Sequence, residues 1–402
     1  MSLKKAHEKL VLVALSGGVD SSVSALLLKE AGWSVEALYM HNWEEEAGED
    51  CPGTRDFQDA RRVADLLEIP LHRACFASAY RERVFQPFLV AYQSGLVPNP
   101  DVWCNREIKF GLLWEHARRL GVTHLATGHY ARLEVGKHFT RLLRSHDHRK
   151  DQSYFLNQLT SQQLGNTLFP IGHLTKPQVR ELARQRGLPN HAKKDSTGIC
   201  FIGEKPFREW LSQYLPGTPG LILDENGRTV GTHPGSFYYS LGQRKGLGIG
   251  GIRGGRDASW YVYEKDLSQN LLRVTQNPRH PNLWTTRISL SDFHWIGEAA
   301  APGRITGSGK TRYQQADISC ELDWTVEGPA TVSFESPVFA PTPGQFFVFY
   351  QDEWCRGGGP IAQIVSDDLS VPSPRNEPAG APGHRETKEK ERVMKPGTSP
   401  VV

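Results

Sequence analysis

The start of the chain constrains its fold most tightly. Residues 10–15 (LVLVAL) form an unbroken apolar run, which is typical of a parallel strand buried on both faces. The polar turn SGGVDSS, residues 16–22, follows, and then a helical pattern that closes near Gly32 and a second strand-like run, VEALYM. This strand–helix–strand unit predicts a parallel sheet whose carboxyl edge carries a ligand site.

The same alternation continues to about residue 130. Helical patterns cover 56–69, 79–95 and 105–120, and strand-like runs cover 71–76 and 123–128. We therefore expect an α/β fold, a doubly wound parallel sheet with helices on both faces. Residues 131–145 read as a hairpin inserted near the carboxyl edge of that sheet, and 175–187 as a helix capped by Thr175.

The composition changes along the chain and predicts several domains, since 402 residues exceed one ordinary domain. Residues 1–216 hold the α/β domain with its inserted hairpin and a helical segment. Short strands and turn pairs predict a small, mainly β central domain over 217–280 and a β-barrel over 281–367. Residues 368–402 are rich in Pro, Gly and charge, which predicts a disordered tail.

Bulk properties exclude some classes of protein. Six cysteines without a CxxC pair argue against zinc-ribbon, iron–sulfur and thioredoxin-like sites, and we predict no metal-ligand set. No apolar stretch reaches the ~20 residues that span a membrane. The basic and then apolar start runs into SGGVDSS rather than a cleavage site, so we expect a cytoplasmic protein with reduced thiols.

The turn SGGVDSS is suited to a phosphate. Two glycines let backbone N–H groups converge, and the helix N-terminus adds positive charge. The lysine of a Walker A loop is missing, and the spacing of a third glycine does not fit the dinucleotide fingerprint. The structural alternative is a tight turn between strand and helix.

Two cysteines lie in unusually polar surroundings, in NPDVWCNREIKF and DSTGICFIG. We expect Cys104 and Cys200 to be exposed, and a helix starting near Asn105 would lower the pKa of the Cys104 thiol. The alternative is that both are ordinary core cysteines. That structural reading is preferred for the others: Cys51, Cys75, Cys320 and Cys355.

The turn SGGVDSS resembles the PP-loop of the N-type ATP pyrophosphatases, which cleave ATP between its α and β phosphates. Further stretches make the resemblance narrower, and over residues 10–365 the chain is similar to the family of tRNA-specific 2-thiouridylases. The stretches are NPDVWCNREIKF, ATGHYAR, KDQSYFL, KKDSTGICFIGE, LGQRKGLGIGG, KTRYQQADI and TPGQFFVFY.

The resemblance implies an ATP-dependent tRNA sulfurtransferase. The C2 oxygen of the wobble uridine would be adenylated, and a sulfur carried as a persulfide on Cys200 would replace it, giving 2-thiouridine, AMP and pyrophosphate. Cys104 would be the nucleophile that forms a disulfide bond with Cys200. Asp101 would assist as general acid or base, or would only cap a turn. A partner protein would supply the sulfur.

The resemblance also implies contact residues, with Mg²⁺ expected alongside ATP and Asp20 as a candidate ligand. Met40 would lie against adenine, or would serve only as core. The residues implied to bind ATP are Ala14, Leu15, Ser16, Gly17, Gly18, Val19, Asp20, Ser21, Met40 and Gly128. Those implied to bind the anticodon arm of tRNA are Asn99, Pro100, Asp101, Lys150, Asp151, Gln152, Arg312 and Tyr313, the last two on the C-terminal barrel.

Residues 137–152 form a basic strip that either contacts RNA phosphates or is a solvated hairpin face. Its cations are Lys137, Arg141, Arg144, Arg149 and Lys150. Two other functions are considered. An adenylating, amide-forming ligase similar to GMP synthetase would not need the two cysteines, and a non-catalytic RNA-binding protein would not turn ATP over.

Overall fold

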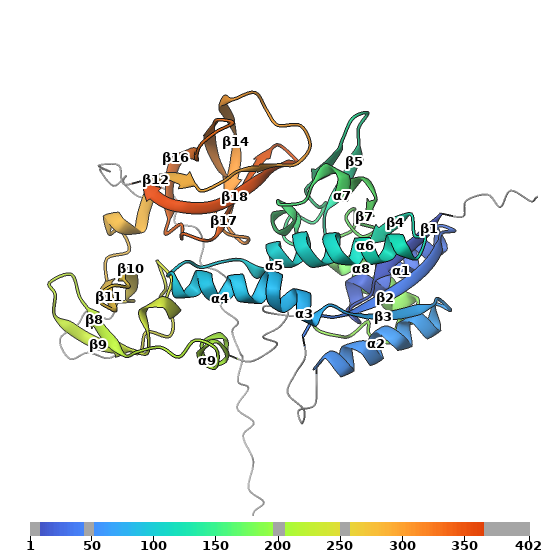
Figure 1. The fold of residues 1–402 in the computed structure, drawn as a ribbon, viewed down its shortest axis with the longest axis horizontal. Coiled ribbons are helices and arrows are strands. Elements are labelled where there is room, and N and C mark those ends of the chain that lie inside the picture. Colours follow the sequence, from blue (N-terminus) through green and yellow to red (C-terminus); the bar gives the residue numbers. More distant parts are fainter. Residues whose placement is uncertain (1–8, 44–51, 196–205, 250–257, 366–402) are drawn as a thin grey trace, which may run out of the picture. The chain divides into compact units, whose positions relative to one another are not determined.

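The structure is a computed structural model that describes residues 9–43, 52–195, 206–249 and 258–365 (Figure 1). Residues 1–369 form one compact unit. The predicted tail, residues 368–402, lies outside the described residues. None of the described helices is both long and apolar enough to cross a membrane.

A parallel sheet follows the first strand. Its strand order is β3-β2-β1-β4-β7, and every pair is parallel. The strands are β1 (Leu10–Ala14), β2 (Ser34–His41), β3 (Leu71–Cys75), β4 (His124–Ala126) and β7 (Thr167–Leu168). The predicted strands at the start of the chain are all present, and Thr167–Leu168 adds a short edge strand within a region predicted to be mainly helical.

Helices cover both faces of this sheet, as predicted, because alternate side chains of β1 point to opposite faces. Val11 and Val13 pack in a core with α1 (Val19–Glu30), α2 (Pro52–Leu66) and α8 (Lys176–Gln185). Leu12 packs in a second core with α6 (Leu113–Arg119) and the helical turns before it. Figure 1 shows α6 and α2 on opposite sides of β2 and β3.

Two long helical runs contain π-helical turns, in which the backbone bonds skip one residue further than in an α-helix. The first run comprises α3 (Ala77–Tyr80), the π-helix η1 (Arg81–Phe85) and α4 (Gln86–Gln93). The second comprises α5 (Pro100–Trp103), the π-helix η2 (Cys104–Leu112) and α6. Shorter helices are η3 (Ser153–Leu156), α7 (Ser161–Gly165) and α9 (Phe207–Ser212).

The hairpin predicted over 131–145 forms, and its further pairing is with the last sheet of the chain. It consists of β5 (Arg132–Val135) and β6 (Thr140–Leu143), and β6 pairs with β18 (Trp354–Val365) of the last sheet. Local patterning predicts the two strands and their turn. The partner strand lies more than two hundred positions away, so no local signal identifies it.

The rest of the described chain is β-rich, as predicted. A four-stranded sheet has the order β10-β11-β8-β9, with β8 (Gly220–Leu223), β9 (Thr229–His233), β10 (Tyr261–Asp266) and β11 (Leu271–Thr275). The last sheet closes into a barrel because β12 pairs with both β16 and β18. Its other elements are β12 (Trp284–Leu290), β13 (His294–Trp295), β14 (Gly303–Lys310), β15 (Ile318–Trp324), β16 (Ala330–Phe339) and β17 (Phe346–Gln351), with 3₁₀ turns η4 (Ser236–Tyr238) and η5 (Pro281–Leu283) before it.

Candidate active site

The glycine loop, residues 16–22, joins β1 to α1 at the carboxyl edge of the parallel sheet. Gly17 has a φ of +77°, and a Cβ there would overlap the carbonyl oxygen of Asp56, so only glycine fits. Gly18 is the N-cap of α1, and the Ser22 hydroxyl donates to its carbonyl at 2.8 Å. The positive end of α1 is therefore surrounded by small residues, as anion binding requires.

The end of β4 packs directly on this loop. Val13 of β1 pairs with Ala126 of β4, and the strand order reverses between these two strands. A Cβ on Gly128 would lie 2.6 Å from the backbone nitrogen of Ser21. The sequence pattern predicted a ligand site at the edge of the sheet, and the structure places the loop at the topological switch point, where such sheets bind ligands.

A segment distant in sequence holds the loop from the other side. We call residues 190–195 the anchoring segment. The Asn190 amide donates to the carbonyl of Gly17 and the hydroxyl of Ser22, both at 2.9 Å. The Lys193 ammonium donates to the same Gly17 carbonyl at 3.2 Å and forms ion pairs of 2.6 and 2.7 Å with two carboxylates of α2. These contacts fix the carbonyl side of the loop.

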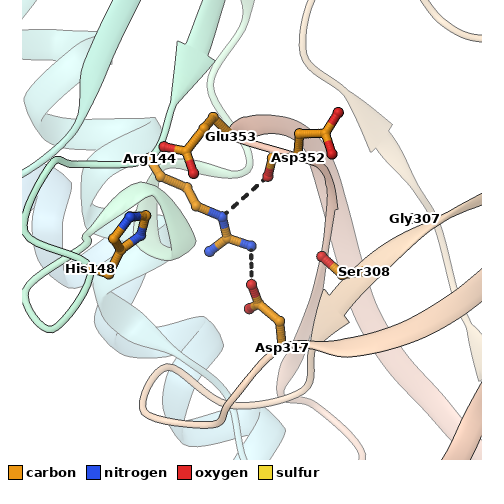
Figure 2. Close-up of a pocket in the computed structure, with 7 residues that line it drawn as sticks. All are labelled: Arg144, His148, Gly307, Ser308, Asp317, Asp352 and Glu353. Atoms are coloured by element: carbon orange, nitrogen blue, oxygen red, sulfur yellow. Dashed lines mark hydrogen bonds and ion pairs between the residues drawn. The ribbon is translucent and has the colours of Figure 1, made fainter.

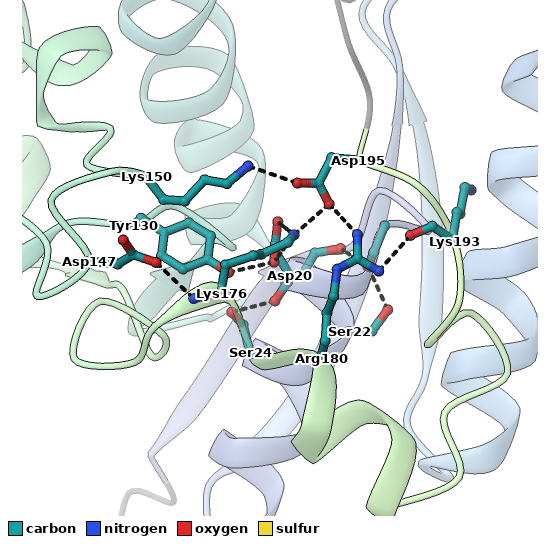
Figure 3. A network of polar contacts seen from close by, with 12 residues as sticks. Asp20, Ser22, Ser24, Tyr130, Asp147, Lys150, Lys176, Arg180, Lys193 and Asp195 are labelled. Atoms are coloured by element: carbon teal, nitrogen blue, oxygen red, sulfur yellow. Dashed lines mark hydrogen bonds and ion pairs between the residues drawn. The ribbon is translucent and has the colours of Figure 1, made fainter. Parts of the chain in front are cut away.

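The first turn of α1 joins a network of charges that Figure 3 shows. The Lys176 ammonium lies 2.8 and 2.9 Å from the two carboxylate oxygens of Asp20 and 2.7 Å from Asp195. Tyr130 donates its hydroxyl to Asp20 at 2.8 Å, and Arg180 lies 2.6 Å from Asp195. We call this set the loop cluster; its members are Asp20, Tyr130, Lys150, Lys176, Arg180 and Asp195.

The electrostatics of the loop cluster favour its charged form. Burial alone would raise the pKa of Asp195, but hydrogen bonds from Lys176 and Lys150 outweigh it and lower the pKa to about 2. Burial, followed by the neighbouring Asp20 carboxylate, raises the pKa of the Tyr130 hydroxyl. Asp195 therefore remains ionised, and Tyr130 remains a hydrogen-bond donor, at neutral pH.

Asp20 is the carboxylate of the glycine loop, and its chemistry suits Mg²⁺. Its Oδ1 accepts hydrogen bonds from Lys176 and Tyr130 and its Oδ2 accepts one from Lys176, so a lone pair of Oδ2 remains for a metal while the lysine contact is kept. Among the described residues no group of three or more His, Cys, Asp or Glu side chains is arranged to hold a metal. Asp20 thus fits a metal that comes with a nucleotide, as one ligand among phosphates and water.

Cys104 lies inside the helical run rather than at its start, and it is buried, with 3% exposed. Both expectations from the sequence were wrong at this position. The Asn99 side chain accepts from the N–H groups of Asp101 and Val102 at 3.2 and 3.4 Å, and Pro100 occupies the first helical turn. An Asn cap followed by proline begins the helix one turn earlier than the amphipathic pattern suggests.

The π-helix η2 begins at Cys104, and side chains from elsewhere satisfy its backbone. The Gln163 amide donates to the carbonyls of Phe110 and Arg106 at 2.9 and 3.4 Å. Asn105 donates to the carbonyl of Phe155 at 3.0 Å. π-Helical turns are frequent at functional sites, and here the turn starts at the predicted nucleophile.

Cys104 shares its apolar surroundings with the end of β2. Met40, which is predicted to contact adenine, packs against the core that contains Cys104 and also against the core that contains Phe110. Burial raises the pKa of the Asp101 carboxyl, and Lys109 opposes that shift. Burial, and then the charge of Lys109, lowers the pKa of His129 well below its usual value. A raised pKa favours the protonated form of the Asp101 carboxyl, the form that a general acid uses.

Several residues that are predicted to contact tRNA make contacts within the protein. Asp151 is buried and accepts from the Ser153 hydroxyl at 2.9 Å, and Gln152 accepts from the Tyr130 backbone at 2.9 Å. Arg144 of the basic strip is also buried, so it does not belong to an exposed phosphate-binding face. Lys150, by contrast, is partly exposed and bonds Asp195 at 2.9 Å.

Arg312 and Tyr313 are likewise engaged. The Arg312 guanidinium donates to the Ala340 carbonyl and to the Thr342 hydroxyl, and burial lowers its pKa. The Tyr313 ring lies 4.5 Å from the ring of Phe155. Their predicted contact with RNA remains a prediction. Cys200 and Cys51 lie outside the described residues.

Sequence reasoning missed several residues that shape the site. They are Tyr130, Gln163, Lys176, Arg180, Asn190, Lys193 and Asp195. Lys193 and Asp195 stand in the quoted stretch KKDSTGICFIGE, so a signal existed for them. Lys176 follows a helix cap in an ordinary amphipathic helix, and its pattern gives no hint of a site.

The parallel sheet, the glycine loop at its switch point and the charges around that loop define the class of PP-loop ATP pyrophosphatases, which use ATP. Profiles of three known domains match the chain. "tRNA methyl transferase HUP domain" matches residues 9–204, "tRNA methyl transferase PRC-barrel domain" 208–276 and "Aminomethyltransferase beta-barrel domain" 285–361.

Whole-chain relatives give a narrower assignment. The tRNA-specific 2-thiouridylase MnmA of Nitrosomonas eutropha is 49% identical over 357 residues, which cover 88% of this chain and 99% of the relative. The MnmA protein of Alcanivorax borkumensis is 48% identical over 90% of this chain and 100% of its own length. The chain belongs to the family of tRNA-specific 2-thiouridylases.

Solved structures resemble only part of the chain. The U34-tRNA thiolase NcsA of Methanococcus maripaludis matches 51% of this chain and 63% of its own, at 18% identity and a TM-score of 0.32. A 4-thiouridine synthetase–RNA complex with bound ATP matches 51% of this chain and 50% of its own, at 14% identity and a TM-score of 0.31. Neither likeness is close enough to support an argument.

Proposed function

We propose that this chain is a tRNA 2-thiouridylase that replaces the C2 oxygen of the wobble uridine by sulfur. The observation that carries the proposal is the 49% identity to a named 2-thiouridylase over nearly the whole relative. The glycine loop at the switch point of the sheet supplies the ATP site that such a reaction requires. The substrates are ATP and a tRNA with a wobble uridine in its anticodon arm.

The first half of the reaction activates the base. The glycine loop and the N-terminus of α1 bind the phosphates of ATP, with Met40 near the adenine and Gly128 allowing close approach. The C2 oxygen of uracil attacks the α phosphorus, and the bond to the β phosphate breaks, releasing pyrophosphate. Asp20 would contact an Mg²⁺ ion that accompanies ATP, and such an ion would supply neutralisation of the phosphate charge.

The second half moves sulfur. A persulfide on Cys200, loaded by a sulfur-donor protein, attacks C2, and the Cys104 thiolate attacks the inner sulfur of Cys200. The sulfur–sulfur bond of the persulfide breaks, a Cys104–Cys200 disulfide forms and AMP leaves, so the sulfur gains the two electrons that the two thiols lose. A thiol reductant then restores both cysteines. Asp101 acts as general acid or base at the uracil.

The remaining predictions extend this proposal. The target base would be unstacked between Asn99, Pro100 and Asp101, because chemistry at C2 cannot occur inside a stacked anticodon. Lys150 is the best-exposed member of the predicted tRNA contacts around the loop cluster. The proposed domain limit at 280 falls in the gap between the second and third matched profiles, whereas the limit at 216 lies inside the second profile and that at 367 after the third. We place the enzyme in the cytoplasm, where tRNA is modified.

One experiment tests the proposal directly. Purified protein is incubated with ATP, Mg²⁺, a persulfide donor and unmodified tRNA, and the digested nucleosides are weighed. A mass gain that matches exchange of oxygen for sulfur in one uridine is expected. An absence of this product with folded protein and competent tRNA would contradict the proposal.

The Cys104→Ser variant tests the role of the buried thiol. We expect 2-thiouridine formation to fall below detection while ATP binding is retained, because the variant keeps the fold but cannot open the persulfide. Cys75→Ser is the matched control, since Cys75 is exposed at the end of β3 and has no assigned role. A fully active Cys104→Ser enzyme would contradict the two-thiol mechanism of sulfur transfer.

A further inference from the structure

Lys176 lies between two carboxylates that belong to different parts of the candidate site. Asp20 belongs to the glycine loop, and Asp195 ends the anchoring segment. Cys200 follows Asp195 by five positions in the sequence, outside the described residues. The lysine side chain is 10% exposed, whereas the two carboxylates are about a third exposed. Figure 3 shows the lysine between them. One ammonium group therefore ties the nucleotide loop to the residue from which the chain continues toward Cys200.

The position of Lys176 is itself fixed by the backbone. Its N–H group donates to Asp147 at 2.9 Å, and Thr175 before it is the N-cap of α8 in a capping box with Gln178. Helix α8 packs in the same core as α1. The helix cap thus fixes the backbone of Lys176, and the two carboxylates hold its ammonium group.

The anchoring segment is held at several successive points. Asn190 bonds the Gly17 carbonyl, and the Arg180 guanidinium donates to the carbonyls of His191 and Lys193 at 3.3 and 3.0 Å. Arg180 and Lys150 then reach Asp195, which leaves this carboxylate with three cations within 2.9 Å once Lys176 is included. These contacts hold the anchoring segment in one position relative to the glycine loop.

We infer that Lys176 is a positioning residue for sulfur transfer, which holds Asp195 against Asp20 so that the chain leading to Cys200 starts at a set distance from the nucleotide loop. This inference rests on the proposed function, and it links the adenylation step to the sulfur-transfer step. An ammonium shared by two carboxylates is already neutralised, so it serves as a tie rather than as a spare phosphate ligand. Sulfur transfer depends on such placement, since misplacement by about 1 Å can cost on the order of 100-fold in rate.

The test measures adenylation and sulfur transfer separately in the Lys176→Met variant. Adenylation is measured as the burst of pyrophosphate released with tRNA in the absence of persulfide. Transfer is measured as single-turnover formation of 2-thiouridine by persulfide-loaded enzyme. We expect transfer to fall by about 10- to 100-fold and adenylation to change by less than about 3-fold. A parallel loss in both halves, or no loss in transfer, would overturn the inference.

Three further variants make the result specific. Asp195→Asn removes the other end of the tie and is expected to show the same split. The double variant is expected to lose less transfer than the product of the two single losses, because both substitutions remove the shared Lys176–Asp195 contact. Each also removes contacts of its own, those of Lys176 with Asp20 and those of Asp195 with Lys150 and Arg180. Arg184→Gln is the control, since Arg184 lies on the exposed face of α8 and pairs only locally with Glu181. Additive losses in the double variant would contradict a shared role.

The design also distinguishes failure of the inference from failure of the proposed function. If wild-type enzyme forms no 2-thiouridine, the proposed function fails. If wild type is active and Lys176→Met loses both halves alike, only the positioning role fails. If Lys176→Met does not fold, Asp195→Asn carries the test alone, because loss of one partly exposed carboxylate leaves Lys176 paired with Asp20.

Discussion

The loop cluster and a second charge cluster use the same residue types for different purposes. The second, which we call the joint cluster, contains Arg144, Asp151, Asp317 and Tyr350, where the hairpin joins the barrel. Figure 2 shows two of its members, Arg144 and Asp317. Arg144 and Asp151 have side chains 5% and 2% exposed, whereas the carboxylates of Asp20 and Asp195 are 31% and 33% exposed. Buried charges stabilise only while they are paired, and accessible ones can exchange partners with a ligand.

The contacts of Arg144 explain why it is structural. Its guanidinium lies 3.5 Å from the centre of the Tyr350 ring, 2.7 Å from Asp317 and 3.4 Å from Asp151. A cavity of about 410 Å³ opens beside it, lined also by His148. Arg144 and Glu353 at this cavity are paired within the protein, and none of the residues implied to bind ATP or tRNA lines it.

The largest expected effect is on stability, in Arg144→Met. Removal of a buried cation leaves Asp151 without its charge partner, and we expect a loss of about 3–5 kcal/mol in the apparent free energy of unfolding. Arg141→Met is the control, because Arg141 is exposed and pairs with Glu134, and its loss should cost less than about 1 kcal/mol. Urea unfolding measures both. Equal losses of unfolding free energy in Arg144→Met and Arg141→Met would contradict the structural role of the joint cluster.

A second prediction concerns the glycine loop, through Gly128→Ala. The added Cβ would lie 2.6 Å from the Ser21 nitrogen and 2.8 Å from the Asp20 carbonyl carbon, so the loop must shift. We expect ATP affinity to fall by about 10-fold or more, with a stability loss of about 1–3 kcal/mol. Gly165→Ala, where the nearest atom is 3.9 Å away, should retain wild-type affinity. Equilibrium binding of ATP tests this prediction. An unchanged ATP affinity in Gly128→Ala would show that the nucleotide binds elsewhere.

The smallest effect is the pH response of the loop cluster. The pKa of Asp195 is lowered to about 2 in the folded protein from an ordinary value of 3.8. A lowered carboxyl pKa contributes stability that is present above about pH 4 and is lost as the pH falls toward 2. With Asp195 a third exposed, the contribution is at most about 1 kcal/mol. The free energy of unfolding, measured from pH 5 to 2.5, should decline less steeply in Asp195→Asn than in the wild type. Identical pH profiles would contradict the ion-paired state of Asp195.

Local signals predicted much of the α/β domain. The apolar run 10–15, the two glycines after it and the cap at Thr175 each place an element where the structure has it. Prediction failed where a partner was distant. The hairpin strand β6 pairs with β18, and the helix expected at Asn105 begins at Pro100 because the Asn99 side chain caps it. Register and pairing depend on residues that a short window does not contain.

The candidate site divides in the same way. The sequence by itself indicated the glycine loop, through two glycines between a buried strand and a helix, and it singled out Cys104 by its polar neighbours. Only the tertiary structure decided that Cys104 is buried at the start of a π-helix and that Lys176 joins Asp20 to Asp195. Backbone conformation is a local property, whereas burial and charge pairing depend on which distant segments the fold brings together.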